Sequence, residues 1–210
     1  MLIKTSVGTA GQAPADREEG SVSRIVRSYS VALTGRSRPT QGAGFVWRHD
    51  GIIITTAHAA KDSRVSVRLY DNRVVEGRVV ARDRLSDLAM VVTHARGLLI
   101  APVGDPWALR TGSIVLAIEH SREPAGQLSL GLVHGVTRDD DKDPLWLATD
   151  MRLALRDMGS PLVDTSARVL GVNSATVNGL TAAIPSNVIV EFVREVEDEG
   201  LIPKRASLAA

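Results

Sequence analysis

The sequence predicts an all-β body that ends in a single helix, and three observations support this. Apolar and polar residues alternate between residues 65 and 80, with the period of a half-buried strand. Glycines and Asp-Gly or Asp-Asn turns separate further short apolar runs, as in an antiparallel barrel or sandwich. Only the last apolar segment, residues 188–196, has the spacing of an amphipathic helix.

From Ser21 to about Ser186, strands and turns are predicted to alternate. Ile52-Ile53-Ile54 follows the Asp50-Gly51 turn and is predicted to be a buried strand. Residues 65–70 and 74–80 flank an Asp71-Asn72 turn and are predicted to form a hairpin. Further strands are expected at 113–118, 131–135, 145–148, 161–163 and 169–172. Ser186 is predicted to cap the final helix and Gly200 to end it. The buried face of this helix is expected to consist of Val188, Ile189, Phe192, Val193 and Val196.

The composition is that of a globular protein with one large domain or two small lobes. The 210 residues are 44% hydrophobic but only 3% aromatic, so the core must consist mainly of Val, Leu, Ile and Ala. Basic and acidic residues are interspersed and give a net charge of +1, which provides no basic patch for nucleic acid. The absence of cysteine excludes disulfides and thiolate metal sites. No apolar run is long enough to span a membrane.

The two ends are predicted to lie outside the folded domain, which is expected to comprise residues 21–200. Residues 1–20 turn small and polar after the first three, and they are expected to form a disordered arm. This segment lacks the apolar stretch of a secretory signal. It therefore favours a cytoplasmic location, with a periplasmic or secreted location as the alternative. Residues 201–210 are expected to form a short tail.

Five separated motifs occur along the chain. They are Gly42-Ala43-Gly44-Phe45-Val46 with the following Asp50–His58, then Ser86-Asp87-Leu88-Ala89-Met90-Val91-Val92, Gly131-Leu132-Val133-His134-Gly135, Thr149–Leu162, and Ala183-Ile184-Pro185-Ser186-Asn187. Together, over residues 22–198, they resemble the protease domain of the HtrA (DegP-like) branch of trypsin-like serine peptidases. The resemblance implies two six-stranded antiparallel β-barrels of the chymotrypsin/trypsin type, a C-terminal helix, and an active site in the cleft between the barrels. No PDZ domain, which commonly follows in this family, is expected in the short remainder of the chain.

The resemblance makes His58 the general base and Asp87 the group that orients it. The order of His58, Asp87 and the nucleophile position matches the family, with separations of 29 and 71 residues. A serine hydroxyl becomes a good nucleophile only when an adjacent imidazole takes its proton. A carboxylate on the far ring nitrogen fixes the tautomer of that imidazole.

A methionine occupies the nucleophile position. Counted without a gap from Thr149-Asp150, the serine of the family falls on Met158. A thioether has no proton for His58 to remove and cannot form an acyl-enzyme. The oxyanion-hole glycine of the family corresponds to Arg156, and an arginine disfavours both positive φ and close approach of a substrate. The sequence thus indicates a protease scaffold that has lost the ability to hydrolyse peptide bonds.

Ser160 is the alternative nucleophile. It lies two positions after Met158, which is roughly 6–7 Å along an extended chain and beyond the reach of about 3 Å that general-base catalysis needs. A two-residue deletion around the motif would be required to bring its hydroxyl to His58. The alternative to a catalytic role is a structural one, in which Ser160 is a small polar residue that replaces a glycine of the family's motif in a tight turn.

The sequence leaves two alternative hypotheses for the function, and the resemblance alone suggests a third. The chain is a pseudoprotease that binds a peptide or an unfolded protein in the cleft, or it is an active serine endopeptidase that uses Ser160. The third is a structural subunit in a homo-oligomer of similar domains.

No metal or cofactor is predicted: the remaining histidines lack metal-ligand spacing and are expected at the surface, and the acidic run is expected to be a solvated turn. These residues are His49, His94, His120, His134 and the run Asp139–Asp143.

Overall fold

The first half of the chain closes into a six-stranded antiparallel barrel. The computed structural model describes residues 21–35, 41–119, 127–138 and 144–204. The strands of this barrel are β1 (Ser30–Gly35), β2 (Gln41–Arg48), β3 (Ile52–Thr56), β4 (Arg64–Arg68), β5 (Val74–Asp83) and β6 (Leu88–Thr93). They hydrogen-bond in the order β1-β2-β3-β6-β5-β4 and close on themselves. The predicted hairpin is confirmed as β4 and β5, with Val65 opposite Gly77 and Val67 opposite Val75.

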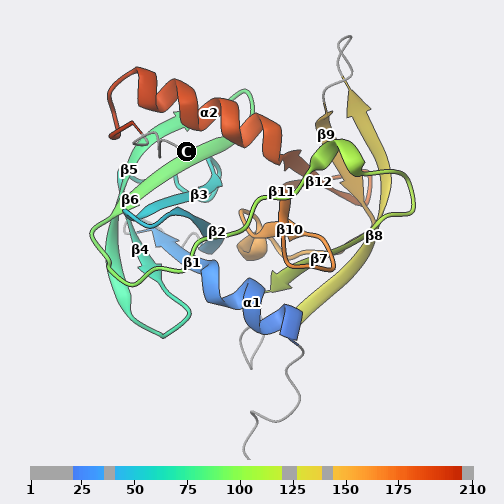
Figure 1. Ribbon diagram of the computed structural model, residues 1–210, viewed down its shortest axis with the longest axis horizontal. Coiled ribbons are helices and arrows are strands. Elements are labelled where there is room, and N and C mark those ends of the chain that lie inside the picture. Colours follow the sequence, from blue (N-terminus) through green and yellow to red (C-terminus); the bar gives the residue numbers. More distant parts are fainter. Residues whose placement is uncertain (1–20, 36–40, 120–126, 139–143, 205–210) are drawn as a thin grey trace, which may run out of the picture.

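The second half forms a second six-stranded barrel. Its strands are β7 (Ile114–Glu119), β8 (Gln127–Arg138), β9 (Pro144–Thr149), β10 (Pro161–Val163), β11 (Val169–Val177) and β12 (Leu180–Pro185). They pair in the order β10-β11-β12-β9-β8-β7. Two short 3₁₀ turns, η1 (Pro106–Ala108) and η2 (Leu155–Asp157), lie in the connections. The two closed antiparallel barrels and the final helix confirm the expected fold class (Figure 1).

Helix α2 (Ser186–Asp198) buries the face that the apolar spacing predicts, including Ile189, Phe192 and Val196. It ends as expected, because Gly200 adopts the left-handed conformation with φ +72°. The predicted cap is wrong. Ser186 is the first residue inside the helix, and its hydroxyl donates to the carbonyl of Gly104. The N-cap is Pro185, which makes no side-chain capping bond.

A second helix, α1 (Ser21–Tyr29), corrects the expectation of strands from Ser21 onward. Its buried residues, Val26 and Tyr29, lie three positions apart and so share one face of the helix. That face joins the apolar layer between the barrels, and α1 contacts β7. Tertiary burial of this face stabilises the short helix.

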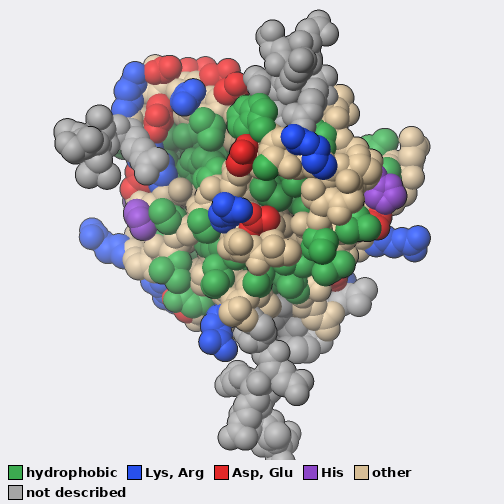
Figure 2. All heavy atoms as spheres, turned by 45° about the vertical axis from the view of Figure 1, so that its right-hand side comes forward, with side chains coloured by type: hydrophobic (Ala, Val, Ile, Leu, Met, Phe, Trp, Pro, Cys, Tyr) green, Lys and Arg blue, Asp and Glu red, His purple; other side chains and the backbone are tan. Residues whose placement is uncertain are grey.

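Three apolar clusters hold the fold together. One fills the first barrel and another fills the second. The largest lies between the barrels and under α2, so that the helix seals one side of their junction (Figure 1). On the face that Figure 2 shows, further hydrophobic side chains gather in patches between scattered charged ones. In the described part of the chain, no helix has the length and apolarity to cross a membrane.

Tyr29 ties the start of the first barrel to the second. Its side chain is 1% exposed, and its hydroxyl donates to the carbonyl of Ala167 at 2.7 Å, in the turn between β10 and β11. Burial, and secondarily the charge of Asp164, raises the pKa of Tyr29 well above its ordinary value. The neutral hydroxyl is thus part of the folded structure.

We expect Tyr29→Phe to lower the free energy of unfolding by about 1–2 kcal/mol, because the buried carbonyl of Ala167 loses its donor. The wild-type protein should also lose stability as the pH rises above about 10, where an unfolded tyrosine ionises but Tyr29 in the folded protein does not. Tyr29→Phe should lack this part of the pH dependence. Denaturant unfolding at pH 8 and at pH 10.5 measures both effects. Tyr70→Phe, at an exposed tyrosine, is the control, and an equal loss in that variant would contradict the assignment.

Candidate active site

His58 and Asp87 meet at one end of the first barrel. His58 lies in the turn after β3, and Asp87 comes directly before β6. Because β3 and β6 pair antiparallel with Thr56 opposite Leu88, these two segments emerge side by side. The Asp87 carboxylate accepts a hydrogen bond from the backbone amide of His58 at 3.0 Å, and its backbone carbonyl accepts one from Ala57 at 2.9 Å.

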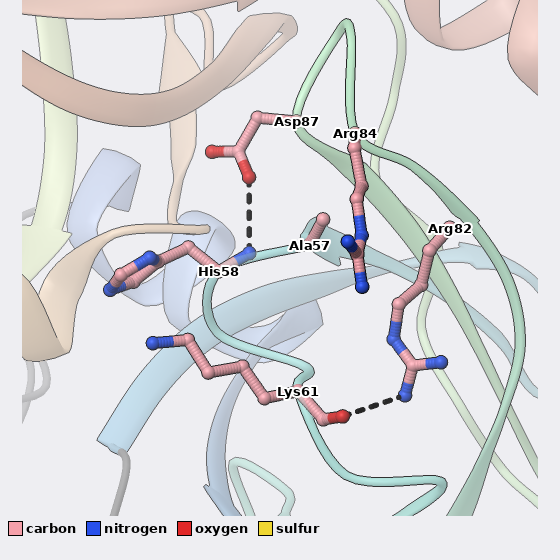
Figure 3. Close-up of a pocket in the computed structure, with 6 residues that line it drawn as sticks. All are labelled: Ala57, His58, Lys61, Arg82, Arg84 and Asp87. Atoms are coloured by element: carbon pink, nitrogen blue, oxygen red, sulfur yellow. Dashed lines mark hydrogen bonds between the residues drawn. The ribbon is translucent and has the colours of Figure 1, made fainter.

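The imidazole of His58 is directed away from the Asp87 carboxylate (Figure 3). The side chain is exposed, and within the described residues its ring makes no hydrogen bond. The structure therefore brings the two predicted residues together through the backbone of His58. The ring-to-carboxylate contact that a catalytic dyad uses is not made.

Ser174, on β11 of the second barrel, is a site residue that the sequence analysis missed. Its hydroxyl donates to the second carboxylate oxygen of Asp87 at 2.6 Å. Asp87 adopts a left-handed backbone conformation, with φ +59°, and these contacts from both barrels fix it there. The feature of the sequence that could have identified Ser174 is the polar pair Asn173-Ser174, which directly follows the buried run Val169–Val172.

Met158 follows η2 and points into the second barrel. Its side chain is 2% exposed and belongs to the apolar cluster of that barrel, together with Leu147 and Leu162. Its carbonyl accepts a hydrogen bond from the amide of Ala43, on β2, at 2.8 Å. The backbone of this motif is thus docked on the first barrel, while the side chain of Met158 packs in the core of the second.

The amides that follow Arg156 are used within the loop. The N–H of Asp157 donates to Ala154 at 2.8 Å, and the N–H of Met158 donates to Leu155 at 3.3 Å. An oxyanion hole requires backbone donors that are directed at the carbonyl of a substrate. The Met158 amide is occupied by the 3₁₀ turn, and the side chain of Arg156 is exposed.

Two glycines from different motifs, Gly42 and Gly159, lie where close contacts exclude a side chain. Gly159 has φ +93°, and a Cβ added there would lie 2.0 Å from the carbonyl oxygen of Ala43. A Cβ on Gly42 would lie 2.4 Å from the Cβ of Ala59 and 3.5 Å from the Met158 carbonyl oxygen. The segment that carries His58 and the segment that carries Met158 therefore converge over Gly42. No larger residue fits at either glycine without displacing the neighbour that it meets, Ala43 at Gly159 and Ala59 at Gly42.

Ser160 is fully buried in the second barrel. Its hydroxyl oxygen accepts a hydrogen bond from the side-chain amide of Asn173 at 3.1 Å. Its carbonyl accepts two more from Asn173, at 3.0 Å from the backbone and 3.1 Å from the side chain. Ser160 thus belongs to the hydrogen-bonded wall beside β11, and none of its bonds within the described residues involves His58.

A polar pocket of about 490 Å³ lies beside His58 (Figure 3). Its lining residues are Ala57, His58, Lys61, Arg82, Arg84 and Asp87. The guanidinium of Arg82 donates to three backbone carbonyls of the segment that follows His58, namely those of Ala60, Lys61 and Asp62. Lys61, Arg82 and Arg84 are all exposed, and Arg82 is the one among them that is anchored to backbone carbonyls.

The other sequence predictions concern residues away from this site. His49, His94 and His134 are exposed, as predicted. His120 and the run Asp139–Asp143 lie outside the described residues. Across the described ranges, no three metal-ligating side chains come together as a metal site would require.

Comparison with known proteins places this architecture in a family. A family model described as a trypsin-like peptidase domain matches residues 42–172. The putative serine protease HhoA of Synechocystis is 29% identical over 84% of this chain, which corresponds to 48% of HhoA. A probable periplasmic serine endoprotease, DegP-like, of Marinomonas is 30% identical over 80% of this chain and 38% of its own length. The chain thus spans less than half the length of these relatives.

A solved structure agrees with the observed architecture. The HtrA-type protease AlgW, solved with a decapeptide, superposes with a TM-score of 0.73 over 86% of this chain and 68% of that one. At 20% identity, this likeness concerns the fold. With the family model and the curated relatives, it leads to one conclusion: the chain belongs to the trypsin-like peptidase family and carries a protease domain of the HtrA type.

Proposed function

We propose that this domain is a pseudoprotease that binds an extended peptide, or an extended segment of an unfolded protein, beside His58 without hydrolysing it. The observation that carries the proposal is Met158, which occupies the nucleophile position and packs its side chain in the second barrel. A thioether there supplies no proton and no alkoxide. Loss of a serine nucleophile costs on the order of a million-fold in turnover.

The geometry around Met158 supports the same conclusion. Ser160, the alternative nucleophile of an active endopeptidase, is buried and hydrogen-bonded to Asn173. The imidazole of His58 lacks the carboxylate contact that would fix its tautomer. The Met158 amide is bonded to Leu155, so it is not directed at a substrate. Each of these features weakens a different part of the hydrolytic mechanism.

Peptide binding is supported by an open strand edge. β10 pairs with β11 only over Val169–Val172, whereas β12 pairs with β11 as far as Val177. In the described part of the chain, residues 175–177 therefore have a strand partner on one side only, and the β11–β12 register shifts at Ser174 just before them. This edge begins at Ser174, next to Asp87, and an extended peptide can add to such an edge through main-chain hydrogen bonds. The structural neighbour AlgW was solved with a decapeptide, and we extend that ligand class to this chain.

We expect the protein neither to cleave casein nor to react with a fluorophosphonate probe, because no activated hydroxyl faces His58. Gel fluorescence after incubation with the probe measures labelling, and active trypsin serves as the positive control. Labelling of the wild type that disappears in Ser160→Ala would establish the competing endopeptidase function and contradict the proposal.

We expect Met158→Ser to destabilise the fold by about 2–5 kcal/mol, because it empties part of the second-barrel core. Met158→Leu preserves the apolar volume and should cost less than about 1.5 kcal/mol. Denaturant unfolding of both variants measures this difference, and equal stabilities would show that the side chain at position 158 does not fill the core.

The double variant Met158→Ser with Arg156→Gly tests the site itself. We expect it to remain unlabelled by the fluorophosphonate probe, because the imidazole is unsupported and the amide at position 158 is occupied. Folding is checked by circular dichroism before labelling. A labelled, casein-cleaving double variant would show that His58 and Asp87 are still arranged for catalysis.

A further inference from the structure

The pocket beside His58 has an excess of positive charge. Three cations, Lys61, Arg82 and Arg84, line it against the single carboxylate of Asp87. Within the described residues, none of these cations forms an ion pair. By contrast, Arg73 and Arg168 at other surface positions are paired with neighbouring carboxylates at 2.6–2.7 Å.

The nearby carboxylates are engaged by other donors. Asp87 accepts from the His58 amide on one oxygen and from the Ser174 hydroxyl on the other. Asp83, which precedes Arg84, accepts from the amides of Leu85 and Ser86 and from the Ser86 hydroxyl. These bonds shape the loop that carries Arg84, and they leave Lys61 and Arg84 available to an external anion, while the guanidinium of Arg82 is held by backbone carbonyls.

The position of the pocket indicates what that anion is attached to. Asp87 is at once a lining residue of the pocket and the hydrogen-bond partner of Ser174, where the open edge of β11 begins. A peptide strand added at that edge sends alternate side chains to opposite faces. The pocket, whose lining residues Figure 3 shows, lies next to this edge, because Asp87 belongs to the one and is bonded to the other.

We propose that the pocket selects an acidic side chain, Asp or Glu, of the extended peptide that binds this domain. This inference rests on the proposed peptide binding and adds a chemical class to it. Arg82 is held by three carbonyls and presents a preorganised positive charge, while Lys61 and Arg84 reach the carboxylate from the exposed rim. Arginine is suited to a carboxylate because its planar fork matches the two oxygens.

The test is a selection from a phage-displayed library of linear heptapeptides on the immobilised 210-residue protein. The wild type should enrich peptides with Asp or Glu at one fixed position. A labelled copy of an enriched peptide should bind about 3- to 10-fold more weakly to Lys61→Gln/Arg84→Gln, as expected for two partly exposed ion pairs. The same peptide with its acidic residue replaced by the corresponding amide should lose affinity for the wild type, but little for the double variant.

The matched control is Arg78→Gln/Arg96→Gln, which removes the same charge from two exposed arginines outside the pocket. It should bind the acidic peptide as the wild type does. Enrichment of peptides without an acidic preference, or an acidic preference that survives in Lys61→Gln/Arg84→Gln, would overturn this inference while leaving peptide binding intact. Failure to enrich any sequence over a blank surface would overturn both proposals. Saturable binding of inorganic phosphate without acidic peptides would assign the pocket to a small anion instead.

Discussion

The docking of the 155–160 loop on β2 is the contact on which the junction of the two barrels depends. The Ala43 amide holds the Met158 carbonyl, and Gly159 passes so close to the Ala43 carbonyl that a Cβ would clash. Neither contact uses the side chain at position 158. The backbone frame of the motif is therefore constrained by architecture, whereas these two contacts place no demand on the side chain at position 158. A methionine can occupy that position because the second barrel offers it an apolar cluster.

Asp87 illustrates the same separation between architecture and chemistry. Its carboxylate joins the His58 segment of the first barrel to Ser174 of the second. Removal of the half-buried Asp87 carboxylate would be costly, because the His58 amide and the Ser174 hydroxyl would each lose their acceptor. An aspartate is thus required at this position even when no imidazole needs orienting. The presence of His58 and Asp87 in a family context is consequently weaker evidence for hydrolysis than the identity of the residue at position 158.

Periodicity in the sequence was enough to predict the β4–β5 hairpin and the buried face of α2, because both depend on local alternation. It failed for α1, whose nine residues gain stability from burying Val26 and Tyr29 between the barrels. Ser174 could not be found in the same way, since it meets Asp87 across 87 residues of chain. The family motifs did locate the converging loops. They could not predict that the imidazole turns from the carboxylate or that the Met158 amide is used within η2, because those depend on side-chain and turn geometry.

On the proposed function, loss of the reaction also changes what the cleft can do with binding energy. A protease gains nothing from holding its substrate tightly in the ground state, since only interactions that strengthen in the transition state accelerate the chemical step. A domain that performs no chemistry is free of that restriction. In the binding mode proposed above, main-chain pairing along the edge of β11 and the cations Lys61 and Arg84 act on the ground state of the bound peptide. On the proposed function, these features can be optimised for slow release, because no product has to leave the cleft.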